Sequence, residues 1–202
     1  MTTSSGLREP ATGLRERKKA ETRLAVHRAA LDLVAEYGFD KVTVEAIADV
    51  ANISRRTFFN YFNDKADAVM YGEEARFRQL IAAVRDRPCG ETGWQALRRA
   101  AEELTERRGE PDREAVLRGK LTRRHPSLLA RQMAGFGPLE RELAQAITER
   151  DGDGGMRPRV LAAAYTGAVR VANIAWLEKQ QNGTLRDILL TALDELEKPF
   201  TR

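Results

Sequence analysis

Residues 43–65 read TVEAIADVANISRRTFFNYFNDK, and they predict two short helices joined by a tight turn. Thr43 is a good N-cap residue, and residues 44–50 then carry an apolar face at helical spacing. Asn52 can take the left-handed conformation that such a turn usually takes from glycine. Ser54 offers a second N-cap, so we expect the next helix to begin directly after it.

The second of these helices has two different faces. Phe58 and Phe62 lie four residues apart and are expected to point inward. Arg55 and Arg56 are then left on the outside. A short helix that exposes two adjacent arginines, braced by a helix packed across it, suits the major groove of DNA, where arginine can bind guanine O6 and N7 bidentately. An isolated pair of arginines would more simply form a solvated helix face.

The same stretch resembles the N-terminal signature of the TetR family, the tetracycline-repressor-type transcriptional regulators. The resemblance covers about the first 70 residues. It rests on Phe39, Thr43-Val44, Ile47-Ala48, Ala51-Asn52-Ile53-Ser54, Thr57-Phe58-Phe59, Tyr61-Phe62 and Lys65. It implies an all-α homodimer with an N-terminal DNA-binding head and a C-terminal body that dimerises and senses a ligand. It also implies a repressor that a small molecule releases from DNA.

The resemblance assigns DNA contacts residue by residue. The implied contact residues are Thr43, Arg55, Arg56, Thr57, Phe59, Asn60, Tyr61 and Lys65. Arg55, Arg56 and Thr57 would face bases or the nearby backbone, whereas Tyr61 and Lys65 would each reach a phosphate. Phe59 stands where the family usually has tyrosine, so a hydroxyl contact to phosphate is lost there. Phe59 would instead touch a thymine methyl group or pack inward.

The rest of the chain also has helical periodicity, and no strand-like alternation of convincing length is present. We therefore predict an all-α fold of about nine helices: a three-helix head that contains the helix-turn-helix, and a larger helical body. The predicted division is a disordered arm over residues 1–13, a DNA-binding domain over 14–65 and a ligand-binding and dimerisation domain over 66–202. The fourth helix, after Asp64, is expected to bridge the head and the body. Residues 135–138 (GFGP) are expected to kink or break a helix of that body.

Composition excludes several classes of protein. No apolar run approaches the ~20 residues of a membrane span, and we expect a cytoplasmic protein. Cys89 is the only cysteine among the 202 residues and there are two histidines, so neither an intrachain disulfide nor a structural zinc site is expected. No glycine-rich phosphate loop or nucleophile elbow is present, which argues against an enzyme; no cofactor is predicted. An all-helical scaffold protein would not need the signature of residues 43–65.

Charge is unevenly distributed along the chain. Residues 1–65 carry 11 Lys and Arg against 9 Asp and Glu, whereas residues 76–131 carry 14 against 8. The second excess includes Arg113, Arg118, Lys120, Arg123, Arg124 and Arg131. It is either a solvated face or a site for an anionic, amphipathic effector such as an acyl-CoA. Aromatic and polar candidates for the effector site are Trp94, His125, Arg131, Phe136, Tyr165, Asn173 and Trp176.

Two C-terminal stretches resemble a helical dimer seam. The first runs from about residue 159 to 181 and is rich in small residues, which let helices approach closely. The second, over residues 184–198, has an apolar stripe. The expected interface residues are Ala163, Ala164, Gly167, Val171, Leu185, Leu189, Ala192 and Leu196. Two helices from each subunit would form a four-helix interface about a two-fold axis, although the same stripes could serve only the core of one chain.

The sequence therefore predicts a sequence-specific DNA-binding transcriptional regulator. The expected partners are a palindromic double-stranded DNA operator, a second copy of the chain and a small-molecule effector. An activator, or a regulator of the same fold that needs no ligand, is the alternative.

Overall fold

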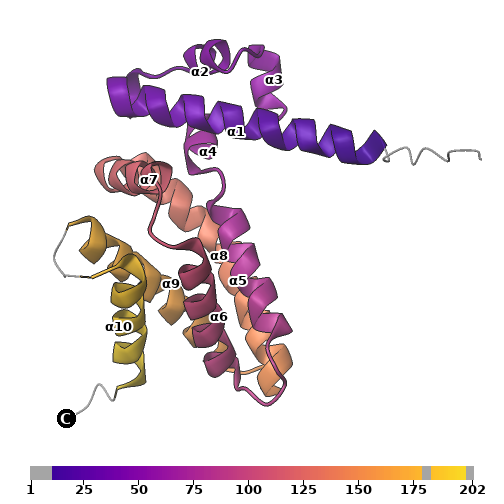
Figure 1. Ribbon diagram of the computed structural model, residues 1–202, viewed down its shortest axis with the longest axis vertical. Helices are drawn as coiled ribbons and strands as arrows, with labels where there is room; N and C mark the ends of the chain where they lie inside the picture. Colours follow the sequence, from indigo (N-terminus) through magenta and orange to yellow (C-terminus); the bar gives the residue numbers. More distant parts are fainter. Residues whose placement is uncertain (1–10, 179–182, 199–202) are drawn as a thin grey trace, which may run out of the picture. The chain divides into compact units, whose positions relative to one another are not determined.

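The computed structural model describes residues 11–178 and 183–198, and these residues are almost entirely helical. They divide into two compact units, Met1–Tyr71 and Gly72–Arg202, each with its own packing. Figure 1 shows the helices of both. Ten α-helices and one 3-10 turn lie in the part of the chain that the structure describes, close to the nine helices expected. The all-α class is confirmed.

The first unit holds a long helix with three short ones. Its elements are α1 (Ala11–Tyr37), η1 (Phe39–Lys41), α2 (Val44–Val50), α3 (Arg55–Phe59) and α4 (Lys65–Met70). Both α2 and α4 pack on α1, and α3 packs on α2. Residues 11–13 of the expected arm belong to α1, while residues 1–10 lie outside the described residues.

The core of this unit is formed by apolar side chains from every helix. Val26, Leu31 and Val34 of α1 are buried, together with Phe58 of α3 and Val69 of α4. Full burial of such side chains stabilises a fold by about 1.5–3 kcal/mol each.

A buried histidine adds a polar tie between two of these helices. The Nδ1 of His27 hydrogen-bonds the carbonyl oxygen of Ala68 at 2.7 Å, and only the protonated nitrogen can donate to a carbonyl. The bond joins α1 to α4. The His27 ring also makes an edge contact with Tyr71, the residue after α4.

The fourth helix is shorter than the bridging helix that the sequence predicts. It ends at Met70, and Gly72 then adopts the left-handed conformation, with φ 91°, before α5 begins. The expectation that the fourth helix bridges the head and the body is therefore wrong, because α4 ends inside the first unit. An L-residue with a side chain rarely adopts this φ, which is why glycine stands at the break. The unit boundary follows Tyr71, six residues after the boundary expected from the sequence.

The second unit is a bundle of longer helices. Its elements are α5 (Glu73–Asp86), α6 (Gly93–Arg108), α7 (Arg113–Arg124), α8 (Pro126–Asp151), α9 (Met156–Leu177) and α10 (Leu185–Glu197). In Figure 1, α5 and α8 lie along each other, and α10 packs on α9 and α6. Helix α8 continues through Pro138, so the expected break at residues 135–138 does not occur.

Helix α9 corrects one expectation drawn from composition. It has 22 residues, and its most apolar 18-residue window has a mean hydropathy of 1.3, so by length and composition alone it could cross a membrane. It also contains Arg170 and packs between α8 and α10, as the core helix of a bundle does.

Candidate nucleic-acid interface and effector site

The turn between α2 and α3 is built as the sequence predicts. The Oγ1 of Thr43 accepts a hydrogen bond from the Ala46 N–H at 3.1 Å, and the Oγ of Ser54 accepts one from the Thr57 N–H at 3.0 Å. Asn52 has φ 53°, and it is the one non-glycine with positive φ in the described chain. Both caps and the left-handed asparagine are therefore confirmed.

Helix α3 separates an inner from an outer face. Phe58 of α3 and Phe62, which follows the end of the helix, are buried, and their ring centroids lie 5.7 Å apart. Arg55 and Arg56 are exposed, as is Asn60, while Thr57 is half-buried. The buried rings fix the rotation of α3, and this fixed rotation presents the two arginines to solvent.

Arg55 is held on the outer face by two neighbours. Its Nε lies 2.9 Å from Oε1 of Glu45 on α2, and its guanidinium lies 5.5 Å from the ring centroid of Phe59. Both charged side chains are more than half exposed, and exposed pairs of this kind contribute only about 0–1 kcal/mol. Arg55 can therefore exchange Glu45 for another partner at little cost.

Phe59 and Tyr61 differ in their surroundings. The side chain of Phe59 is 46% exposed, which excludes the inward packing considered from the sequence. Tyr61 is half-buried, and the guanidinium of Arg23 on α1 lies 5.6 Å from its ring centroid. A basic side chain of α1 therefore borders the face of α3.

Lys65 makes contacts that the sequence does not suggest. Its Nζ donates to the carbonyl oxygens of Phe39 at 2.7 Å and Val42 at 3.0 Å, and it lies 4.5 Å from the Phe39 ring centroid. Two of its three N–H groups thus close the segment between α1 and α2. This geometry gives Lys65 a structural role, and its contact with a DNA phosphate stays a prediction.

Two of the expected effector residues come together in the second unit. Phe136 of α8 and Tyr165 of α9 both contact Phe77 of α5, with ring centroids 5.9 and 6.4 Å apart. Tyr165 is 7% exposed, and burial raises the pKa of its phenol well above the ordinary value. Trp176 packs against the same core. Sequence reasoning missed Phe77, although its position on the inner face of an amphipathic helix was a usable signal.

The contacts known for the other expected effector residues are of a different kind. The side chain of Asn173 donates to the Val169 carbonyl oxygen of its own helix at 2.8 Å. His125 joins the end of α7 to the start of α8, and Arg131 is exposed on α8. The Trp94 indole N–H donates to Oε1 of Glu197 at 2.6 Å.

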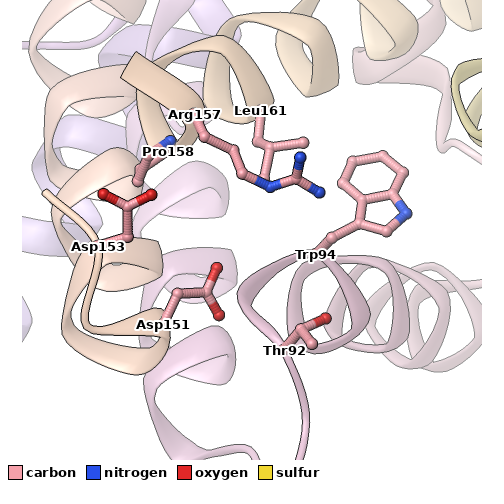
Figure 2. A pocket seen from close by; sticks show the side chains of 7 residues that line it. All are labelled: Thr92, Trp94, Asp151, Asp153, Arg157, Pro158 and Leu161. Atoms are coloured by element: carbon pink, nitrogen blue, oxygen red, sulfur yellow. The ribbon is translucent and has the colours of Figure 1, made fainter. Parts of the chain in front are cut away.

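Trp94 also borders an open surface hollow of about 340 Å³. Figure 2 shows the side chain of Arg157 reaching from α9 toward Trp94 on α6. The other lining residues are Thr92, Asp151, Asp153, Pro158 and Leu161. Among the described residues, no group of three or more His, Cys, Asp and Glu side chains could hold a metal ion.

The basic excess of residues 76–131 is partly structural. Arg118 is 3% exposed, and its Nε lies 3.2 Å from Oε1 of Glu73. Burial lowers the pKa of Arg118, while the charge of Glu73 raises it. The side chain of Gln132 also donates to both oxygens of Glu73. Arg123 forms an ion pair with Glu178.

The expected interface residues divide between two helices. On α9, Ala163 is exposed, and Val171 is 53% exposed. Ala164 and Gly167 are half-buried, and a Cβ at Gly167 would meet nothing within 4 Å. Met156 and Val160 extend this apolar stripe toward the start of the helix.

On α10 the expected stripe faces inward. Leu189 is buried in the chain's own core, and Leu185, Ala192 and Leu196 pack against that core. For Leu189 the assignment to a dimer seam is therefore corrected, because its side chain is already covered by the same chain. The reason is that α10 needs an apolar face to pack on α9 and α6.

Comparison with known proteins agrees with this architecture. Residues 27–68 match the family model described as bacterial regulatory proteins, tetR family, and residues 91–201 match the MftR C-terminal domain model. The chain is 32% identical over 173 residues to the transcriptional regulator TcmR of Streptomyces glaucescens, which covers 81% of this chain and 76% of the relative. It is 43% identical over 49 residues to YdeS of Bacillus subtilis, which covers 24% of this chain and 25% of that protein.

Solved structures share the fold at low identity. The fatty acid degradation regulator FadR of Bacillus halodurans superimposes with a TM-score of 0.59 at 16% identity, over 90% of this chain and 97% of that one. FadR of Thermus thermophilus, a repressor solved in complex with lauroyl-CoA, has a TM-score of 0.56 at 21% identity, over 89% of this chain and 95% of that one.

Proposed function

This chain belongs to the TetR family of DNA-binding transcriptional regulators, and we propose that it is a cytoplasmic homodimeric repressor that a small molecule releases from a palindromic operator. The observation that carries the proposal is the outer face of α3, where Arg55 and Arg56 are exposed while Phe58 and Phe62 are buried beneath them. An activator or a ligand-independent regulator of the same fold is the alternative. Deleting the gene would raise reporter transcription from the operator for a repressor and lower it for an activator.

We assign the reading of bases to α3. Arg55 and Arg56 would bind base edges in the major groove, where a good bidentate arginine–guanine pair discriminates by about 1–3 kcal/mol. Phe59 lies beside Arg55 and is exposed enough to touch a thymine methyl group. The remaining contacts to bases or phosphates are assigned to Thr43, Thr57, Asn60, Tyr61 and Lys65.

The readout can be tested by selecting bound sequences from random DNA and then measuring affinity for single-base variants of the consensus. Arg55→Ala and Arg56→Ala should each relax preference at a particular operator position. Lys41→Ala, which removes an exposed cation outside α3, should leave base preference intact. If both arginine variants keep full preference, the reading face lies elsewhere.

We propose that the apolar stripe of α9 joins two subunits. The support is its exposure: Met156, Val160 and Val171 are each more than half exposed, and Gly167 has open space around it. Monomeric proteins rarely leave such a continuous apolar stripe uncovered. Gly167→Glu should yield folded monomers in sedimentation and weaken operator binding, because a palindrome is read by both subunits. A wild-type protein that is monomeric at micromolar concentration and on DNA would exclude this interface.

We propose that the effector binds the second unit and acts by changing the population of DNA-binding conformations. Such a ligand weakens DNA binding only by its differential affinity for two conformations, commonly about 1–3 kcal/mol. The support is the aromatic cluster around Phe77 in a helical body and the lauroyl-CoA complex of a structural relative. The effector is expected to be an amphipathic anion, of which an acyl-CoA is one example.

A further inference from the structure

Arg76 of α5 and Arg108 of α6 lie close together in the second unit, and neither is paired with a carboxylate in the described part of the chain. Arg108, at the end of α6, donates from Nη2 to Oε1 of Gln79 at 2.9 Å and to the carbonyl oxygen of Arg76 at 3.4 Å. Arg108 is an exposed residue, and the desolvation of its guanidinium together with the positive charge of Arg76 lowers its pKa. Neither arginine forms an ion pair within the described residues.

Several other arginines of the same unit do have a counter-charge. Arg118 pairs with Glu73, and Arg87 pairs with Glu91 and Glu103. Arg108 meets only uncharged acceptors here, and two cations next to each other repel. The pair is therefore a place where a bound anion would relieve an unfavourable interaction.

Aromatic rings lie next to the pair. Tyr165 interacts electrostatically with Arg108, and its ring contacts Phe77, which in turn contacts Phe136. Burial raises the pKa of Tyr165, so its hydroxyl is protonated at neutral pH. That hydroxyl makes no hydrogen bond to any residue in the described part of the chain, which leaves it free to donate to a ligand.

The arrangement is amphipathic. Arg76 and Phe77 are adjacent on α5, and neighbours on an α-helix point about 100° apart, so the charged group borders the ring. An occupant would place its negative end at Arg76 and Arg108 and its flat apolar part against Phe77 and Phe136. Planar guanidinium groups match a carboxylate with two parallel hydrogen bonds.

We propose that Arg76, Arg108 and the Tyr165 hydroxyl bind the anionic group of an aromatic carboxylate, which docks against Phe77 and Phe136. This inference rests on the proposed effector-binding role of the second unit and assigns its chemistry. It also moves the anion-binding function away from Arg123, which pairs with Glu178, and from the exposed Arg124.

The probe is 2-naphthoate, compared with the neutral 2-naphthamide, and binding to the purified full-length protein is measured by calorimetry. Wild-type protein should bind 2-naphthoate and bind 2-naphthamide at least tenfold more weakly. Arg76→Gln and Arg108→Gln should each weaken 2-naphthoate binding by about tenfold to a hundredfold, since a hydrogen bond to a charged group is worth about 1.5–3 kcal/mol. The same variants should leave 2-naphthamide binding unchanged.

Two further variants control for indirect effects. Tyr165→Phe keeps the ring and should weaken 2-naphthoate binding less than either arginine variant. Arg124→Gln removes an exposed charge of the same unit and should have no effect. Arg76→Gln should also leave the unliganded melting temperature unchanged or higher, because it relieves repulsion; a large drop would indicate a structural role and contradict the proposal.

The proposal is overturned if 2-naphthoate does not bind at millimolar concentration, if both probes bind equally, or if Arg124→Gln has the same effect as the two arginine variants. Operator binding measured in parallel separates this inference from the proposed function. Arginine-dependent binding of 2-naphthoate without loss of operator affinity supports the site and counts against its regulatory role.

Discussion

Lys65 provides a sharp test of how the first unit is held together. We expect Lys65→Met to destabilise this unit, because methionine keeps the apolar stem and removes the ammonium group. The variant loses two hydrogen bonds, to the carbonyl oxygens of Phe39 and Val42, and the contact with the Phe39 ring. It also leaves those two carbonyl oxygens without their charged donor.

The magnitude follows from these contacts. A hydrogen bond from a charged group contributes about 1.5–3 kcal/mol, and a cation–π contact adds about 0.5–2 kcal/mol. The contributions share one ammonium group and are not additive, and Lys65 is only half-buried, so water offsets part of the loss. We therefore expect the free energy of opening of the first unit to fall by about 2–4 kcal/mol.

Hydrogen exchange measured by mass spectrometry resolves the two units by peptide. Amides of α1 and α2 should lose protection by about 30- to 1,000-fold in Lys65→Met, since 1.4 kcal/mol corresponds to tenfold. Amides of α8 should not change. Lys41→Met, which removes an exposed lysine from the neighbouring turn, is the matched control and should have little effect.

The salt dependence of DNA binding tests the alternative, in which Lys65 acts only as a phosphate contact. If Lys65 served only as a phosphate contact, Lys65→Met would lower the slope of log affinity against log salt by about one unit and leave exchange unchanged. That pair of results would refute the structural role of Lys65.

Substitutions of Glu45, Ser54 and Glu91 test three other contacts. Glu45→Gln frees the Arg55 guanidinium and removes a negative charge near α3, so affinity for both the operator and random DNA should rise severalfold at most; a lower affinity in a binding titration would contradict this. Ser54→Ala removes the cap of α3 and should lower stability by about 1 kcal/mol in a urea titration followed by circular dichroism, with Ser54→Gly less damaging. The hydrogen bond from Arg87 lowers the pKa of Glu91 from 4.5 to about 2, so the stability that this pair supplies is fully present above pH 4.5 and is lost as the pH falls toward 2. The difference in melting temperature between wild type and Glu91→Gln should therefore shrink over that range, and a constant difference would argue against the ion pair.

Much of the first unit could be predicted because its signals are local. Thr43, Asn52 and Ser54 act on backbone groups within a few residues, and such caps and turns are encoded by residue type and spacing. Phe58 and Phe62 follow the same logic, since spacing alone places them on one face. The class of protein follows from this stretch as well.

The contacts that the sequence did not predict involve partners far apart in the chain. The ammonium of Lys65 donates to carbonyl groups 26 and 23 residues away. The residues next to Lys65 in the sequence do not indicate that its side chain packs against the segment between α1 and α2. The first helix shows the same limit: Val26, Ala30, Leu33 and Tyr37 fit a helical stripe, but Val34 is buried and Tyr37 is exposed. The spacing of apolar residues predicts that α1 has a buried face, but it leaves the direction of that face around the helix axis uncertain by one residue position. Only the packing of α2 and α4 on α1 settles it.

The proposed effector site was harder to predict, because four helices contribute to it. Phe77, Phe136 and Tyr165 come together only when α5, α8 and α9 pack, and Arg76 and Arg108 meet through the packing of α5 on α6. The count of charges in residues 76–131 indicated an excess. Which cations were already neutralised by Glu73 or Glu178 depended on the fold.

The placement of the two tryptophans makes the intrinsic fluorescence of the chain a probe of its second unit. Trp94 borders the hollow on α6 and Trp176 packs against the core of the second unit, whereas residues 1–71 contain no tryptophan. Excitation at the red edge of protein absorption therefore yields emission from the second unit alone. A ligand that quenches or shifts this emission reports its arrival there directly, while melting of the first unit passes unseen. Replacing either indole with phenylalanine would leave a single chromophore, so the core and the hollow could be followed separately without attaching a dye.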